Sequence, residues 1–324
     1  MTPLEIYQLV APELARVEEE LRGYTRSDIR PISEIGEYLL NAGGKRLRPT
    51  LLLLTAKMLG EVTPTQIRLA AVVEFIHNAT LVHDDVIDAA DTRRGRPSAN
   101  SHWGNSMTVL AGDWLYMQSF AVALAEKNLD ILTTLIEITQ KMVEGELLQL
   151  TLLGKSDPTS QQLLDIAERK TAYLFAGCMK LPALALGLQD GTAERLSTMG
   201  KNLGMAFQLI DDSLDLTSTQ AVLGKPVVND LKEGKLTLPV YYAVQDGGPE
   251  ALAKVRQVLD EREFRSVEPS EILGLVQRSQ GLERTRAMAQ DYVASAIKLL
   301  ESFPSSVYRD AILSIPEFII TRSA

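Results

Sequence analysis

The chain has 324 residues, of which 45% are hydrophobic and 23% are charged, values that are ordinary for a globular protein and exclude a disordered or collagen-like chain. The net charge of -9 argues against nucleic acid as the main partner. No stretch of about 18 residues is free of charge, so we expect no membrane span.

The first part of the chain is punctuated by proline and glycine at intervals that suit helices. Pro64 stands at the first-turn position of the longest predicted helix, where the missing amide hydrogen costs nothing. The helices expected here run from Pro31 to Gly43, from Pro49 to Gly60 and from Pro64 to Asp88, and a basic loop follows at 89–103.

The rest of the chain continues the same pattern, and runs of alternating β-branched residues are scarce. No internal repeat and no Gly/Ser/Pro-rich linker divides the chain, so we predict a single all-α domain over 1–324. The further helices are expected at 105–126, 128–153, 159–176, 179–188 and 192–219, then a polar loop at 220–235, then shorter helices separated at 247–249, Pro269, Gly281 and Pro304.

The cysteine content limits the disulfides and metal sites that the chain can form and indicates its cellular compartment. The single cysteine, Cys178, excludes an internal disulfide framework and a cysteine-based zinc site. A reducing cytoplasm is the expected location. The first residues have neither a basic start nor a long apolar core, so we expect no signal peptide.

Two segments, residues 84–88 and 211–215, share the pattern Asp-Asp-x-x-Asp. On a helix, the first and last aspartates of each segment lie about 40° apart around the axis and share a face. Like charges at this spacing repel by a few tenths of a kcal/mol, and a divalent cation removes that cost. Carboxylates suit Mg²⁺, which commonly adds phosphate ligands. A solvated acidic face is the alternative, but each segment follows an apolar run, which favours a metal site.

Basic residues are grouped near both acidic segments. The segment 43–49 carries three cations at a predicted helix start, and the segment 93–96 carries three more soon after the first acidic segment. Lys225 and Lys235 flank the second polar loop, and Lys170 precedes a threonine inside a predicted helix. Ordinary surface charge explains any one of these groups, but beside aspartate motifs they indicate binding of diphosphates.

The histidines contribute little chemistry of their own. His77 lies seven residues before Asp84, about 20° away around the helix, and faces the same side. His83 is one position off that face, so we expect it to pack against a neighbouring element. With only three histidines in the chain, the ligand set of a His-Asp phosphohydrolase is hard to assemble.

Three segments together resemble the trans-isoprenyl (polyprenyl) diphosphate synthases. HDDVIDAADTRRGRP at 83–97 resembles the first aspartate-rich motif of that family, and FQLIDDSLDLTSTQAVLGKPVVNDLKEGKLTLP at 207–239 resembles the second. GGKRLRP at 43–49 resembles the motif for the homoallylic diphosphate. The resemblance implies a bundle of long helices around a deep apolar cavity, of the isoprenoid synthase type, and usually a homodimer.

The resemblance also assigns roles by position in these motifs. About three Mg²⁺ ions are implied, held by Asp84, Asp88, Asp211 and, through water, Asp215. Isopentenyl diphosphate is assigned to Lys45, Arg48, His77 and Arg94. The allylic diphosphate is assigned to Arg93, Lys170, Thr171, Gln208, Lys225 and Lys235. In two places the chain departs from the family pattern: Val228 stands where many members have glycine, and Ala89 replaces a frequent acidic residue.

The expected activity is that of a Mg²⁺-dependent all-trans polyprenyl diphosphate synthase, which joins isopentenyl diphosphate head to tail onto geranyl, farnesyl or geranylgeranyl diphosphate. Short-chain members close the cavity with aromatic residues five and four positions before the first motif, where this chain has Ala79 and Thr80. We therefore predict a product of about C40–C50, for quinone side chains.

Three other functions stay open at this point. A synthase with a C15–C20 product and a non-catalytic subunit of a heteromeric synthase both fit the same motifs. A class I terpene cyclase shares the metal chemistry, but it has no use for a second diphosphate site, so Lys45, Arg48 and Arg94 argue against it.

Overall fold

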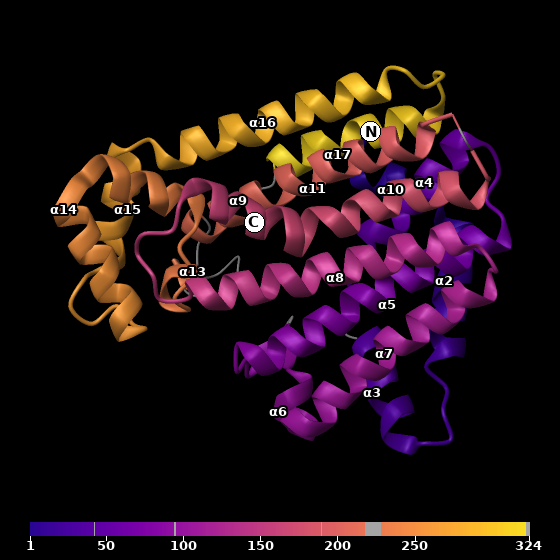
Figure 1. Cartoon of the computed structure of the whole chain (residues 1–324), viewed down its shortest axis with the longest axis horizontal. Helices are drawn as coiled ribbons and strands as arrows, with labels where there is room; N and C mark the ends of the chain where they lie inside the picture. Colours follow the sequence, from indigo (N-terminus) through magenta and orange to yellow (C-terminus); the bar gives the residue numbers. More distant parts are fainter. Residues whose placement is uncertain (42, 94, 189, 218–227, 322–324) are drawn as a thin grey trace. The chain divides into compact units, whose positions relative to one another are not determined.

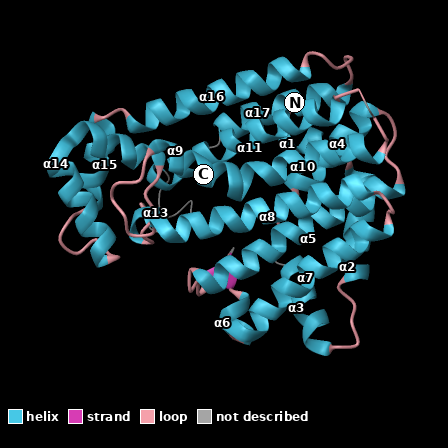
Figure 2. Ribbon diagram, in the orientation of Figure 1, coloured by secondary structure: helices cyan, strands magenta, loops and turns pink. Residues whose placement is uncertain are grey.

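A computed structural model describes the chain except for residues 42, 94, 189, 218–227 and 322–324 (Figure 1). The described residues form helices joined by short loops. Within them, the strands β1 (Thr92–Arg93) and β2 (Arg96–Pro97) pair antiparallel, with Thr92 opposite Pro97 (Figure 2). The predicted all-α fold is confirmed.

The N-terminal helices begin and end close to the predicted positions. Thr63 and Gln66 form a capping box around Pro64, which explains why the longest predicted helix starts there. The predicted loop at 89–103 instead holds the small hairpin and a short helix. The helices are α1 (Pro3–Gln8), α2 (Ala11–Tyr24), α3 (Arg30–Asn41), α4 (Leu47–Leu59), α5 (Pro64–Ile87), α6 (Ala99–Trp103), α7 (Asn105–Ala125) and α8 (Leu129–Leu152).

The following helices differ from the prediction in two places. The predicted break between 176 and 179 is wrong, because Gly177 is a site of close packing: a Cβ there would lie 2.4 Å from Cδ1 of Ile138. The predicted polar loop at 220–235 holds a short helix in its described part. The elements are α9 (Ser160–Ala167), the π-helical turn η1 (Glu168–Ala172), α10 (Tyr173–Ala185), α11 (Thr192–Thr217) and α13 (Asn229–Lys232).

The C-terminal helices are α14 (Leu238–Glu261), α15 (Pro269–Arg278), α16 (Gly281–Leu300) and α17 (Val307–Thr321). Three of the predicted boundaries are found as such, because Pro269 and Gly281 each begin a helix and Pro304 lies between two. The predicted break at 247–249 is also found, since Gly248 has non-helical dihedral angles and α14 consists of two helical parts that meet there at a kink. None of the helices in the described part of the chain has the length and apolarity that crossing a bilayer takes.

The chain forms two compact units. The first comprises Met1–Thr139, Gly177–Ser197 and Phe303–Ser314, and the second comprises Gln140–Ala176, Thr198–Ser302 and Ile315–Ala324. In the first unit α5 packs against α2, α4 and α7, and Figure 1 shows α5 and α7 side by side. The residues 51–54 of α4 are fully buried leucines in this unit. The single-domain organisation stays a prediction.

The second unit is organised around α14, which packs against α9, α13, α15 and α16. An apolar cluster fills this part of the unit and includes Val228, Leu231, Val240 and Val255. Val228 is completely buried there, directly before α13. The second aspartate segment lies at the C-terminal end of α11 and is therefore in the same unit as α13.

Candidate functional site

The first aspartate segment occupies the C-terminal end of α5. Asp84 is half-buried and Asp88, which caps the helix, is exposed. Asp85 is only 2% exposed, and its Oδ1 accepts a hydrogen bond from Nε of Arg93 at 2.5 Å. The first and last aspartates are thus the accessible ones, as their spacing predicts, while the middle one anchors the hairpin that carries Arg93.

The face of α5 that carries Asp84 also carries His77 and Thr80. All three side chains are half-buried, whereas Ala79 is fully buried. Thr80 lies about 40° from Asp84 around the helix axis, and its hydroxyl donates to the carbonyl of His77 at 2.7 Å. This face therefore joins one residue assigned to isopentenyl diphosphate and one assigned to chain length with the first metal segment.

His83 packs away from this face, as its position predicts. Its Nε2 lies 3.1 Å from the carbonyl oxygen of Val109 and 3.4 Å from Oδ1 of Asp113. Gly112 permits the approach, since a Cβ there would lie 2.3 Å from the same nitrogen. His83 therefore contributes to the packing of α5 against α7.

In the basic segment at the start of α4, one cation forms structural ion pairs and two others lie beside it in the sequence. Arg46 has a left-handed backbone with φ of 46°, and its guanidinium donates to Glu18 at 2.6 Å and to Glu74 at 2.7 Å. Desolvation lowers the pKa of Arg46, but the hydrogen bonds and charges of these two carboxylates outweigh it and raise that pKa above its ordinary value. Lys45 is exposed and Arg48 is half-buried on either side of this structural ion pair.

The second aspartate segment gathers carboxylates at the end of α11. Asp211 is exposed, and Asp212 and Asp215 are half-buried. Desolvation, together with the charges of Asp211 and Asp215 and against a hydrogen bond from Gln208, raises the pKa of Asp212 to about 7. Such crowding of negative charge is relieved by a cation, so the donor set suits Mg²⁺.

A hydrogen-bond chain joins η1 to α11 in the second unit. The Thr171 hydroxyl donates to Oε1 of Gln208 at 2.6 Å, and Nε2 of Gln208 donates to Oδ1 of Asp212 at 2.8 Å. Thr171 and Lys170 lie in η1, and π-helical turns of this kind are frequent at functional sites. Lys170 forms an ion pair with Glu146 of α8. Two residues assigned to the allylic diphosphate are therefore linked to the second acidic segment.

Asp215 is bound to the start of α13. Its two carboxylate oxygens accept the backbone N–H groups of Asn229 and Asp230, each at 3.1 Å. Burial and then the charge of Asp215 raise the pKa of Asp230 well above its ordinary value. Lys235 follows, and its ammonium lies 2.9 Å from Oε2 of Glu233.

The sequence prediction missed three residues that contact this site: Asn229, Asp230 and Glu146. Asn229 and Asp230 stand in the quoted second motif, but residues 216–228 separate them from Asp215, so no local signal placed them beside it. Glu146 had no such signal, because only tertiary packing brings it to Lys170. Arg94 and Lys225 lie outside the described residues.

The site residues form two groups, one in each compact unit. Lys45, Arg48, His77, Arg93 and the first aspartate segment belong to the first unit, and Lys170, Thr171, Gln208, Lys235 and the second segment belong to the second. Among the described residues, no three His, Cys, Asp or Glu side chains form a ready-made metal cage. Mg²⁺ is usually bound by one or two carboxylates together with substrate phosphates, and each aspartate segment has carboxylates that reach solvent.

The sequence matches the polyprenyl synthetase family over residues 29–273. It is 34% identical over 319 residues to an octaprenyl diphosphate synthase of Escherichia coli, covering 98% of both chains, and 36% identical over 316 residues to a heptaprenyl diphosphate synthase component 2 of Geobacillus stearothermophilus, covering 97% of both. A polyprenyl synthase of Caulobacter crescentus, crystallised with calcium and isoprenyl diphosphate, superposes with a TM-score of 0.93 at 34% identity over 100% of this chain and 98% of that one. These matches extend along the whole chain, which therefore belongs to the polyprenyl synthetase family of prenyltransferases.

Proposed function

We propose that this protein is a Mg²⁺-dependent all-trans polyprenyl diphosphate synthase with a product of about C40–C50. The observation that carries the proposal is the pair of aspartate segments at the ends of α5 and α11, each with its own cationic residues. The name of the E. coli relative, an octaprenyl synthase, supports a long product. Quinone side chains are the proposed use, and the cytoplasmic location stays a prediction that rests on the single cysteine.

The proposed metal ligands are Asp84, Asp88 and Asp211, with Asp215 through water. About three Mg²⁺ ions are proposed per site. When bound, they neutralise the charge that develops on the leaving diphosphate. The carboxylates of this chain would hold those ions at the ends of two helices, and at one of them burial and the charges of Asp211 and Asp215 raise the pKa of Asp212.

The cationic residues are proposed to bind the two substrates separately. Lys45, Arg48, His77 and Arg94 bind isopentenyl diphosphate, and Arg93, Lys170, Thr171, Gln208, Lys225 and Lys235 bind the allylic diphosphate. Charge-assisted hydrogen bonds from lysine and arginine orient diphosphates and hold the reacting carbons close together. The hydrogen bonds among Thr171, Gln208 and Asp212 fix the orientation of two of these side chains.

The proposed reaction begins when the allylic C–O bond breaks heterolytically and diphosphate leaves with the electron pair. The double bond of isopentenyl diphosphate then attacks the allylic cation and forms the new C–C bond. Loss of a proton, taken up by the departing diphosphate, restores a double bond and completes one five-carbon addition. An apolar cavity is proposed to receive the growing chain and to exclude water, which would quench the cation.

The substrate assignment predicts separable kinetic effects. Lys45→Ala should raise the KM for isopentenyl diphosphate, and Lys170→Ala should raise the KM for the allylic substrate. Each KM should rise roughly tenfold to a hundredfold, because one charge-assisted phosphate contact contributes about 1.5–3 kcal/mol. Steady-state kinetics with each substrate varied in turn measures both values.

The control for this pair is Lys141→Ala, which removes a lysine that pairs with Glu144 on the surface of α8. It should leave both KM values unchanged. If Lys45→Ala and Lys170→Ala raised both KM values equally, the assignment of the two lysines to different substrates would be wrong.

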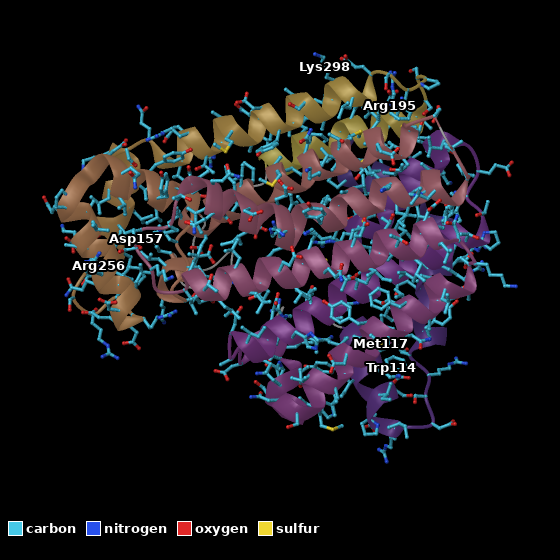
Figure 3. All side chains as sticks on the ribbon, viewed as in Figure 1. Trp114, Met117, Asp157, Arg195, Arg256 and Lys298 are labelled. Atoms are coloured by element: carbon cyan, nitrogen blue, oxygen red, sulfur yellow. The ribbon has the colours of Figure 1, made fainter. Side chains whose placement is uncertain are left out.

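A homodimer is also proposed, through exposed apolar stripes on α7 and on α8. On α7, Leu110, Met117 and Leu124 recur every seven residues and are 59–64% exposed. On α8, Leu129, Ile136, Val143 and Leu150 recur with the same spacing and are also exposed. Residues seven apart lie about 20° from one another on a helix, so each set forms a stripe. Figure 3 marks Met117 and the neighbouring Trp114 on α7.

Such stripes of exposed large apolar residues are typical of a surface that is covered in the assembled protein. A second copy is the proposed occupant, because the spacing of seven on two helices suits helix packing. Met117→Glu should convert the dimer into a monomer, as measured by sedimentation equilibrium. Ile29→Glu is the control, since Ile29 is 59% exposed and precedes α3, outside the stripes. A wild-type monomer, or dimerisation unaffected by Met117→Glu, would contradict this proposal.

The activity itself is tested by incubating the purified protein with labelled isopentenyl diphosphate, farnesyl diphosphate and Mg²⁺. We expect label in an extractable prenyl diphosphate only when all three are present. A cyclised hydrocarbon formed from farnesyl diphosphate alone would identify a terpene cyclase. Incorporation that requires a second protein would identify a subunit of a heteromeric synthase, a reading suggested by the name of the Geobacillus relative.

A further inference from the structure

The carboxylate of Asp215, near the end of α11, binds backbone N–H groups at the start of α13. Its Oδ1 accepts the N–H of Asn229 and its Oδ2 accepts the N–H of Asp230, each at 3.1 Å. Its backbone carbonyl accepts the N–H of Val228 at 3.0 Å. One residue thus satisfies three consecutive backbone donors that a helix start leaves without partners inside the helix.

The residues that carry these amides are hydrogen-bonded in turn to the segment that ends at Lys235. The carbonyl of Asp230 accepts the N–H of Lys235 at 2.8 Å, and the carbonyl of Asn229 accepts the N–H of Glu233 at 2.8 Å. The segment 229–235 is therefore a hydrogen-bonded turn that begins on the carboxylate of Asp215 and ends at a lysine whose side chain is 18% exposed. Asp230 thus connects the two ends, since its N–H binds Asp215 and its carbonyl accepts the N–H of Lys235.

The far side of the same turn is held by Arg262, at the end of α14. Its guanidinium donates to the carbonyl of Glu233. The carbonyl of Gly234 accepts the N–H of Gly154 at 2.9 Å. Gly234 has φ of 87°, and a Cβ there would lie 1.9 Å from Nη1 of Arg262, so glycine is required for this contact.

Val228, directly before the turn, is held in an unusual backbone conformation by its surroundings. Val228 has φ of 62°, which is an unfavourable backbone conformation for a β-branched residue. Its side chain is completely buried in the apolar cluster of the second unit. Burial and the hydrogen bond to Asp215 together compensate for the backbone strain. The turn is thus fixed by Asp215, by the Val228 side chain and by Arg262.

We infer that Asp215 is a positioning residue, which holds the turn 229–235 so that Lys235 is oriented for the allylic diphosphate, and that direct metal binding is not its main role. This inference rests on the proposed function for the identity of the ligand. The cap itself is independent of that function, because it joins backbone and side-chain groups of this chain alone.

Asparagine and alanine at position 215 separate the two roles. Asparagine keeps one acceptor oxygen for the two amides and lacks the charge of a metal ligand, whereas alanine removes both acceptors. Asp215→Asn should keep kcat within about tenfold of wild type, while Asp211→Asn should lose orders of magnitude. Asp215→Ala should raise the KM for the allylic diphosphate by about tenfold or more and leave the KM for isopentenyl diphosphate unchanged.

Hydrogen–deuterium exchange of the protein without metal or substrates provides a second readout. A peptide that covers residues 228–236 should lose protection in Asp215→Ala and lose less of it in Asp215→Asn, which keeps one of the two acceptor oxygens. Arg262→Ala, which acts from the other end of the turn, should cause a partial loss in the same peptide. Arg265→Ala is its control, since this exposed arginine pairs with Glu263, outside the turn, and should change nothing.

Two results would overturn the inference. One is a loss of kcat in Asp215→Asn as large as that in Asp211→Asn, which would make Asp215 a direct metal ligand. The other is unchanged exchange protection in Asp215→Ala, which would show that the carboxylate does not hold the turn. Because exchange is measured without substrates, failure of the inference is distinguishable from failure of the proposed synthase activity.

Discussion

Asp84→Ala and Asp211→Ala are each expected to lower kcat by about a thousandfold or more while the protein stays folded. Each change removes a carboxylate proposed to hold Mg²⁺ at the end of a helix. Both side chains reach solvent at least in part, so neither change leaves a cavity in the core. Removing one of two like charges at i and i+4 can stabilise the protein by a few tenths of a kcal/mol. Steady-state kinetics and thermal melting measure the two effects.

The control for this prediction is Asp246→Ala, which removes an exposed carboxylate that pairs with Arg284 at 3.0 Å. It should leave kcat unchanged. Full activity of either aspartate variant of the motifs, or of the wild-type protein in an excess of chelator, is incompatible with the proposed metal sites.

Phenylalanine at position 79 or 80 is expected to shorten the product to about fifteen to twenty carbons. The growing chain is proposed to extend from the metal site along α5, past the residues one turn before Asp84. An aromatic ring there is proposed to obstruct the path of the growing chain. Consumption of isopentenyl diphosphate should continue, because the first additions need less room. Chromatography of the dephosphorylated products measures the shift.

The two positions are not equivalent in the structure. Thr80 is half-buried on the same face of α5 as Asp84, so its replacement points toward the site. Ala79 is fully buried, and a larger side chain there overpacks the core at a cost of about 1–3 kcal/mol. Thermal melting distinguishes shortening from unfolding, and Thr80→Ser should leave the product unchanged. An unchanged product distribution in both phenylalanine variants would contradict the chain-length assignment.

Local signals predicted most of the helices. The Thr-Pro-Thr-Gln segment at 63–66 contains the whole start signal of α5, and Gly60 ends α4. The errors lie where tertiary packing overrides these signals. Gly177 looked like a helix end, but it permits close packing against Ile138 within a continuous helix. The π-helical turn at 168–172 has no such local signal, because it depends on the fit of neighbouring helices.

The candidate site was predictable where it follows helical periodicity. The spacing of His77, Thr80 and Asp84 predicts a shared face, and the structure places all three half-buried on it. The ion pairs of Arg46 with Glu18 and Glu74 were not predictable, since the partners come from other helices. The cap on α13 was hidden for a similar reason, because Asp215 and its amide partners are separated by residues 216–228.

The length of the wild-type product tests the central claim most directly. Mass spectrometry of the products formed from isotopically labelled isopentenyl diphosphate, farnesyl diphosphate and Mg²⁺ gives the number of added units in one experiment. We predict all-trans prenyl diphosphates that reach about C40–C50. A product that stops at twenty carbons or fewer would contradict the long-chain assignment, and the absence of any product containing isopentenyl units would contradict the proposed synthase activity.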